Sequence, residues 1–226
     1  MSDKIEEIVE KGLKDIESER RITLLGNPRK PEGEEGGLML ERMNRSHTPV
    51  TTWALSLLPD RETPTILDIG CGGGNTLRLL SEKYPDSRLY GIDYSPVSVA
   101  KSIEYNHEDV EKGKLQVTEG SVADMPYEEG SFDLITTVES FYFWPEPVES
   151  LKEVRRVLKK NGTFYLIADI YEKEGLPEEA RQNILRYHLL NPTPEEFRSL
   201  FGQAGFREIR IHLFDGEDWI CVEGKN

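Results

Sequence analysis

Short apolar segments alternate with helical segments along most of the chain. The apolar segments have the length of buried strands, and their neighbours carry apolar residues at the 3.6-residue spacing of a helix. The predicted strands are 65–69, 88–92, 114–120, 132–138 and 162–169. The predicted helices between them are 75–84, 95–110 and 146–158. Alternation of this kind predicts a mostly parallel sheet with helices on both faces.

The last fifty residues predict two helices and a pair of strands. A helix is expected over 177–190, and a capping box at Thr193 opens another helix that ends at Gly205. Segments 206–214 and 218–224 are joined by a tight polar turn and predict a hairpin. The expected fold class is therefore α/β, a doubly wound, mostly parallel seven-stranded sheet with an antiparallel C-terminal hairpin.

The N-terminal part of the chain is less regular. Residues 4–17 show the periodicity of an amphipathic helix, and 27–37 are rich in Gly, Pro and charge, which predicts a mobile loop. Thr48 is expected to cap a helix that has Pro49 at its first position and an apolar stripe behind it.

The composition indicates which kinds of binding partner to expect. Lys and Arg total 28 against 42 Asp and Glu, which gives a net charge of −14. Such a chain repels phosphate backbones and anionic lipid surfaces, so we expect no nucleic-acid and no membrane partner. The two cysteines, Cys71 and Cys221, have no metal-binding spacing. Without an apolar leader or a long apolar run, the expected location is cytoplasmic.

The first two predicted strands end in residues that suit a nucleotide-like ligand. Asp68 is followed by the glycine-rich segment 70–74, which turns sharply into a helix whose free N–H groups favour an anion. Asp93 ends the next strand, about 20 residues further on, where a carboxylate can accept hydrogen bonds from a ribose. The dinucleotide spacing G-x-G-x-x-G would need glycine at Asn75, so a nicotinamide cofactor is a remote alternative.

The spacing D-x-G-x-G-x-G and the segments around it resemble the class I S-adenosylmethionine-dependent methyltransferases, in particular the broad group that acts on small molecules. The resemblance runs from about residue 48 to residue 226, through ILDIGCGGGN, YGIDYSP, EGSVADMPYEEGSFDLI, LKEVRRVLKKNGTFYL and TPEEFRSLFGQAGF. It implies a Rossmann-like methyltransferase fold and S-adenosyl-L-methionine as cofactor.

The resemblance also implies which residues contact the cofactor. Gly70 and Gly72, with Cys71 between them, would lie against its amino-acid part, and Asp68 would hold the amino group directly or through water. Asp93 would hold the ribose, and the remaining implied contacts are Tyr94, Ser121, Val122, Ala123 and Val138. Many relatives carry Asp at the position of Ser121, so the partner of the adenine amine stays open between Ser121 and Asp124.

The fourth strand end, Val138-Glu139-Ser140-Phe141-Tyr142-Phe143-Trp144, should lie beside the transferred methyl group. Its aromatic rings can wall a dry pocket or attract a cation. Glu139 can bind an amine, deprotonate a nucleophile or contact the cofactor. For a hydroxyl acceptor the candidate bases are Glu139, Tyr142 and His47, and no metal is expected.

The chain divides into a predicted helical lid segment, 1–48, and a methyltransferase domain, 49–226, in which 171–192 form a possible substrate cover. The expected function is in-line transfer of a methyl group to a small-molecule acceptor. Two alternatives stay open, methylation of a protein and a cofactor-binding module without catalysis. The protein is expected to be a monomer or a homodimer.

Overall fold

The computed structural model describes residue 22 and residues 26–226, so the amphipathic helix expected over 4–17 lies outside the described residues. All the strands join one seven-stranded sheet in the order β3-β2-β1-β4-β5-β7-β6. The bounds are Thr65–Ile69 for β1, Arg88–Asp93 for β2, Leu115–Glu119 for β3, Phe132–Val138 for β4, Leu158–Ala168 for β5, Arg207–Leu213 for β6 and Ile220–Lys225 for β7. Strand order reverses between β1 and β4, both of which run parallel to their neighbours.

Only β7 breaks the parallel arrangement, because it pairs antiparallel with both β5 and β6. The fold class expected from the hydrophobic pattern is confirmed, including the antiparallel C-terminal hairpin. A doubly wound sheet places ligands at the carboxyl ends of the strands beside the point where strand order reverses. That point lies between β1 and β4, where the glycine-rich turn and Glu139 follow.

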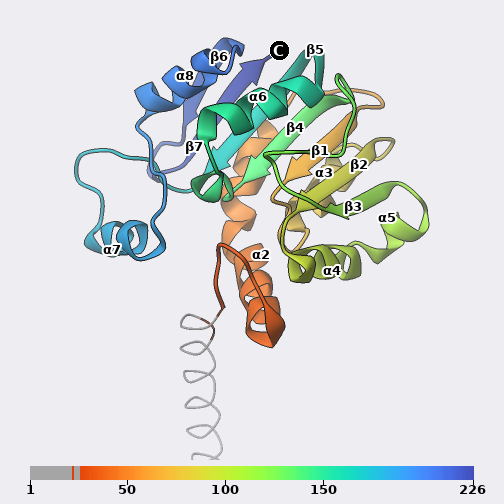
Figure 1. Cartoon of the computed structure of the whole chain (residues 1–226), viewed down its shortest axis with the longest axis horizontal. Helices are drawn as coiled ribbons and strands as arrows, with labels where there is room; N and C mark the ends of the chain where they lie inside the picture. The colour runs from red at the N-terminus through yellow and green to blue at the C-terminus, as the bar shows by residue number, and fades with distance from the viewer. Residues whose placement is uncertain (1–21, 23–25) are drawn as a thin grey trace, which may run out of the picture.

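Helices cover both faces of the sheet (Figure 1), with α6 and α8 in front and the later part of α2 behind. The helices are α2 Gly33–Ser56, α3 Asn75–Lys83, α4 Pro96–Tyr105, α5 His107–Glu111, α6 Pro147–Val157, α7 Glu178–Tyr187 and α8 Pro194–Gln203, with a 3-10 turn, η1, at Phe141–Phe143. Two apolar clusters result. One packs Leu151 of α6 and Phe197 of α8 against the sheet, and the other packs Ala54 of α2 and Leu77 of α3 against it.

Helix α2 corrects two expectations. The loop expected over 27–37 already becomes helical at Gly33, and Thr48 and Pro49 lie inside the helix instead of starting one. The Thr48 hydroxyl donates to the Asn44 carbonyl at 2.7 Å, a bond back into the preceding helical turn. The boundary drawn between 48 and 49 therefore falls within one continuous helix.

The remaining helices agree with the pattern apart from one break. The helix expected over 95–110 is divided at Asn106, whose side-chain amide donates to the carbonyls of Ser102 and Gly74. The capping box at Thr193 is present, with both of its hydrogen bonds. In the described part of the chain, no helix combines the length and the apolar character needed to cross a bilayer.

Candidate active site

The glycine-rich turn after β1 is held against the end of β2. Gly70, Gly72 and Gly74 all have positive φ, at 68°, 51° and 85°, a region that costs other residues energy. The N–H of Gly70 donates to the Ile92 carbonyl at 2.8 Å, and the N–H of Cys71 reaches the same oxygen at 3.2 Å. The chain thus turns directly over the end of β2 before it enters α3.

Asp93 joins this turn through its carboxylate. One oxygen accepts the N–H of Gly72 at 3.0 Å and the other accepts the N–H of Ser95 at 2.9 Å. Burial raises the pKa of Asp93, while the N–H groups of Ser95 and Gly72 act in the opposite direction. No cationic side chain pairs with Asp93 among the described residues. The glycine turn and the acid about 20 residues later therefore form one structure, as the spacing predicts.

Asp68 lies deeper than expected. It is fully buried within β1, where one oxygen accepts the Thr136 hydroxyl of β4 at 2.7 Å. Burial raises its pKa to about 7, against the opposing effect of the Thr136 hydrogen bond, and the nearby Asp93 raises it further. Asp68 lies beneath the cavity described next rather than in its wall.

A cavity of about 480 Å³ opens beside the glycine turn. All the residues predicted from the sequence line it except Asp68, Ala123 and Tyr142. The predicted residues in its wall are His47, Gly70, Cys71, Gly72, Asp93, Tyr94, Ser121, Val122, Val138 and Glu139. Segments from α2 and from the ends of β1, β2, β3 and β4 thus meet around one space.

The end of β3 contributes a short turn. The Ser121 hydroxyl accepts the N–H of Ala123 at 3.2 Å, and Ser121 and Asp124 pair as an isolated bridge. Ser121 and Val122 line the cavity, whereas Ala123 and Asp124 do not. Of the two side chains left open for an adenine amine, Ser121 is the one in the wall.

Glu139 follows β4 with a strained backbone. Its φ is 54°, a left-handed conformation that is uncommon for a residue with a side chain. The Tyr142 hydroxyl donates to both carboxylate oxygens of Glu139 at 3.1 Å, and the Asp169 N–H also donates to this carboxylate. Burial and the charge of Asp169 raise the pKa of Glu139 well above its ordinary value. Tyr142 is itself buried and lies outside the lining of the cavity, where its hydroxyl contacts Glu139.

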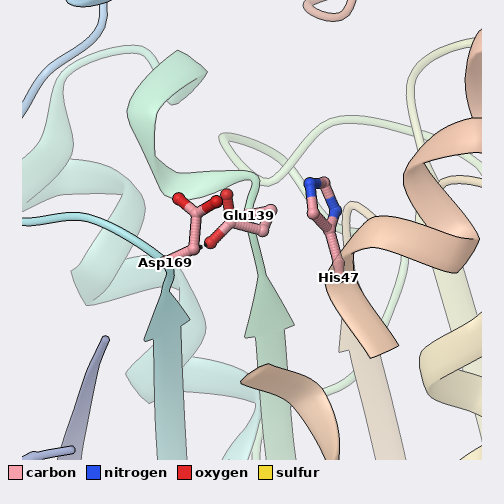
Figure 2. Close-up of side chains that lie close together, drawn as sticks. All are labelled: His47, Glu139 and Asp169. Carbon is pink, nitrogen blue, oxygen red and sulfur yellow. Dashed lines mark hydrogen bonds between the residues drawn. The ribbon is translucent and has the colours of Figure 1, made fainter. Parts of the chain in front are cut away.

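His47 lies beside this carboxylate on α2 (Figure 2). One ring nitrogen of His47 and one carboxylate oxygen each of Glu139 and Asp169 all lie within 4.8 Å of one another. Burial lowers the pKa of His47, and the charge of Asp169 opposes that effect. Burial therefore favours the neutral imidazole, the form that can accept a proton.

The aromatic residues after β4 divide between core and cavity. Phe141 is 1% exposed and packs against Phe197, so it belongs to the core. Phe143 and Trp144 line the cavity, and the Trp144 indole donates to the Ser140 hydroxyl at 3.1 Å. The expected aromatic wall therefore consists of Phe143 and Trp144 only.

Two groups of site residues escaped the sequence analysis. Asp169 follows β5, a fifth strand end that offered the same signal as the other four. On α2, the predicted His47 is joined in the cavity wall by Leu40, Met43, Asn44 and Thr51, and the five residues follow helical spacing along one face. Asn44 donates its amide to the Gly73 carbonyl at 3.0 Å and so ties α2 to the glycine turn. The sequence predicts this row of lining residues once Gly33–Ser56 is taken as one helix.

Comparison with known proteins agrees with this geometry. Residues 67–166 match the family model described as a methyltransferase domain. The chain is 32% identical to a sarcosine/dimethylglycine N-methyltransferase from Halorhodospira halochloris over 146 residues, which are 64% of this chain and 52% of that protein. The chain belongs to the class I S-adenosylmethionine-dependent methyltransferases. The resemblance drawn from the motifs is thereby confirmed.

Other relatives differ in what their names say they act on. A demethylmenaquinone methyltransferase from Staphylococcus aureus is 26% identical, with 73% of this chain and 78% of that protein covered. A solved methyltransferase structure from Aquifex aeolicus superposes with a TM-score of 0.69 at 19% identity, covering 84% of this chain and 97% of that one. The chain spans about half the length of the first curated relatives that it matches.

The residues around the cavity fit the cofactor of this family. The carboxylate of Asp93 accepts the N–H of Gly72 on one oxygen and the N–H of Ser95 on the other, and each oxygen has a second lone pair that can accept a vicinal hydroxyl. Ile92 and Val122 offer apolar surfaces suited to a base, and the turn exposes backbone rather than side chains. In the described wall of the cavity, the acids Asp93 and Glu139 outnumber the one guanidinium, that of Arg29, which suits a ligand that carries an ammonium and a sulfonium group.

Proposed function

We propose that this protein transfers a methyl group from S-adenosylmethionine to a small-molecule acceptor. One observation carries the proposal: a single cavity holds the glycine turn bonded to Asp93 at one side and Glu139 with His47 at the other. A carboxylate that can accept hydrogen bonds from a ribose and side chains that can accept a proton therefore line the same cavity. The cavity volume of about 480 Å³ favours a small acceptor over a protein segment.

Each part of the chain has a defined task in this function. Gly70 and Gly72 present backbone to the amino-acid part of the cofactor, Asp93 accepts the ribose hydroxyls, and Tyr94 and Val122 flank the base. Bound there, S-adenosylmethionine supplies a methyl carbon that already carries a good leaving group. Val138 and Phe143 exclude water, so alignment of the nucleophile supplies most of the rate enhancement.

The proposal is tested at Asp93. In the Asp93→Asn variant the side chain loses its charge and one acceptor oxygen, which removes one of two charge-assisted hydrogen bonds worth about 1.5–3 kcal/mol each. We expect the affinity for S-adenosylhomocysteine, measured by calorimetry, to fall about 10- to 100-fold. The exposed Asp86, changed to Asn, is the matched control. An affinity equal to that of the wild type in the Asp93→Asn variant would refute the site.

A further inference from the structure

Two carboxylates and one imidazole meet beside the cavity. His47 and Glu139 line it, and the exposed Asp169 lies next to Glu139 outside that lining. Glu139 and Asp169 follow neighbouring parallel strands, β4 and β5, in which Val138, the last residue of β4, pairs with Ile167 of β5. His47 reaches the same place from α2 (Figure 2). Within residues 26–226, neither carboxylate has a cationic partner.

This arrangement of the two carboxylates favours a positively charged ligand. Two carboxylates so close together repel each other when both are ionised. Among the described side chains, only the Tyr142 hydroxyl donates to them. A single proton shared between the acids relieves the repulsion in the free protein. A positively charged group that donates hydrogen bonds to both oxygens relieves it better, whereas an alkoxide, phenolate or thiolate would add to it.

We propose that the acceptor is an alkylamine, which binds as an ammonium ion with one N–H donated to Glu139 and one to Asp169, while His47 removes the proton that must leave. The inference rests on the proposed function and specifies its substrate class. The geometry suits this assignment because a ring nitrogen of His47 and carboxylate oxygens of Glu139 and Asp169 all lie within 4.8 Å of one another. Their combined charge also offsets the repulsion between an ammonium ion and a sulfonium ion in the same cavity.

The proposed reaction balances in protons and electrons. One N–H proton of the bound ammonium passes to the neutral imidazole of His47, which leaves a lone pair on nitrogen. That lone pair forms the new bond to the methyl carbon as the carbon–sulfur bond breaks, and sulfur keeps the bonding electrons. The products are S-adenosylhomocysteine and an ammonium ion with one more methyl group, and the proton on His47 passes to solvent.

Matched pairs of amine and alcohol test the assignment. Propylamine and 2-phenylethylamine are titrated into protein saturated with S-adenosylhomocysteine, beside propanol and 2-phenylethanol, and binding is followed by calorimetry. We expect each amine to bind about 30-fold or more tightly than its alcohol, as expected for a buried charge pair. The preference should fall to within a few-fold in Glu139→Gln and in Asp169→Asn, and persist in the exposed control Glu111→Gln.

Measurements of turnover distinguish the role proposed for His47 from the role proposed for Glu139 and Asp169. With S-adenosylmethionine and the better amine, we expect His47→Gln to lower kcat at least about tenfold while the amine dissociation constant stays within twofold of the wild type. Melting temperatures of all variants identify any that do not fold, and Glu139→Asp provides a second acid variant that keeps the charge. A His47→Gln variant with unchanged kcat would overturn the role of His47.

The outcomes distinguish this inference from the function on which it rests. Loss of S-adenosylhomocysteine binding in the wild type would refute the proposed function itself. Normal cofactor binding without any preference for amines would overturn the inference alone. So would stoichiometric binding of Mn²⁺ that is lost in both acid variants and occurs without amine preference, because the cluster would then hold a metal ion.

Discussion

The buried acid Asp68 allows a direct test of the electrostatics of this fold. Its carboxyl group is 1% exposed, accepts one hydrogen bond from Thr136 and has a pKa raised to about 7 by burial. We expect Asp68→Asn to remove the cost of ionising this group while keeping an oxygen that accepts the Thr136 hydroxyl. The variant should therefore be more stable than the wild type, but only where the wild-type acid is charged.

The direction follows from the protons that each state binds. Unfolded Asp68 titrates near 3.8 and folded Asp68 near 7, so between these values the folded state holds more protons. The contribution of this group to the free energy of unfolding is complete below about pH 4 and falls as the pH rises to about 7. With about 1.4 kcal/mol for each pKa unit, the loss reaches about 4 kcal/mol above pH 7.

Thermal unfolding from pH 4.5 to pH 8 measures this loss. For a chain of this length, about 4 kcal/mol corresponds to roughly 10 °C, so the melting temperature of Asp68→Asn minus that of the wild type should rise by roughly this amount across the range. Any fixed cost of the new amide cancels because it does not depend on pH. Asp86→Asn, at an exposed site, should give a flat difference. An equally flat difference for Asp68→Asn would refute the reasoning.

Three further predictions concern the backbone and the thiols. Gly70→Ala would place a Cβ 2.4 Å from a serine hydroxyl at a φ of 68°, and Gly113→Ala has a similar φ of 69° with open space around it. Chemical denaturation should therefore show a clearly larger loss of stability for Gly70→Ala than the about 1–2 kcal/mol expected for Gly113→Ala, and equal losses would contradict the steric argument. Pro49→Ala restores an N–H inside α2, so urea unfolding should show a gain of up to about 3 kcal/mol, and an unchanged midpoint would contradict it. Burial raises the pKa of Cys71 and Cys221, so neither thiol should react with a disulfide reagent at pH 8 until denaturant is added; reaction in the native protein would argue against their burial.

The sheet could be predicted from the sequence because buried parallel strands appear as short, mostly apolar segments. Segment 65–69 carries three apolar residues, Ile66, Leu67 and Ile69, in five positions and is bounded by a polar segment and by glycines, and its bounds coincide with those of β1. Helix α2 was harder to predict because Pro49 normally opens a helix. Burial of Met39, Leu40 and Val50 along one face outweighs the cost of an interior proline, and this tertiary contribution is not visible in local propensity.

The cofactor side of the site was more predictable than the acceptor side. Glycines and Asp93 occupy positions fixed by the spacing of two strands, so local sequence is enough to bring them together. Asp169 joins Glu139 because β5 pairs with β4 in a particular register, and His47 joins them because α2 is longer than its local pattern suggests. Both depend on tertiary packing, so the complete acidic cluster is visible only in the fold.

Several residues in the cavity wall or next to it carry a cost for the folded state. Glu139 holds a left-handed backbone that costs about 1–3 kcal/mol, and Asp68 disfavours the folded state whenever it is ionised. Burial disfavours the charged form of His47, and the ionised form of Glu139 is disfavoured by burial and by the charge of Asp169. A ligand with positive charge offsets the electrostatic costs at Asp68 and Glu139 together, because it provides the counter-charge that both acids lack. In the proposed function, the same groups that destabilise the free protein give it affinity for a sulfonium cofactor and for a cationic acceptor.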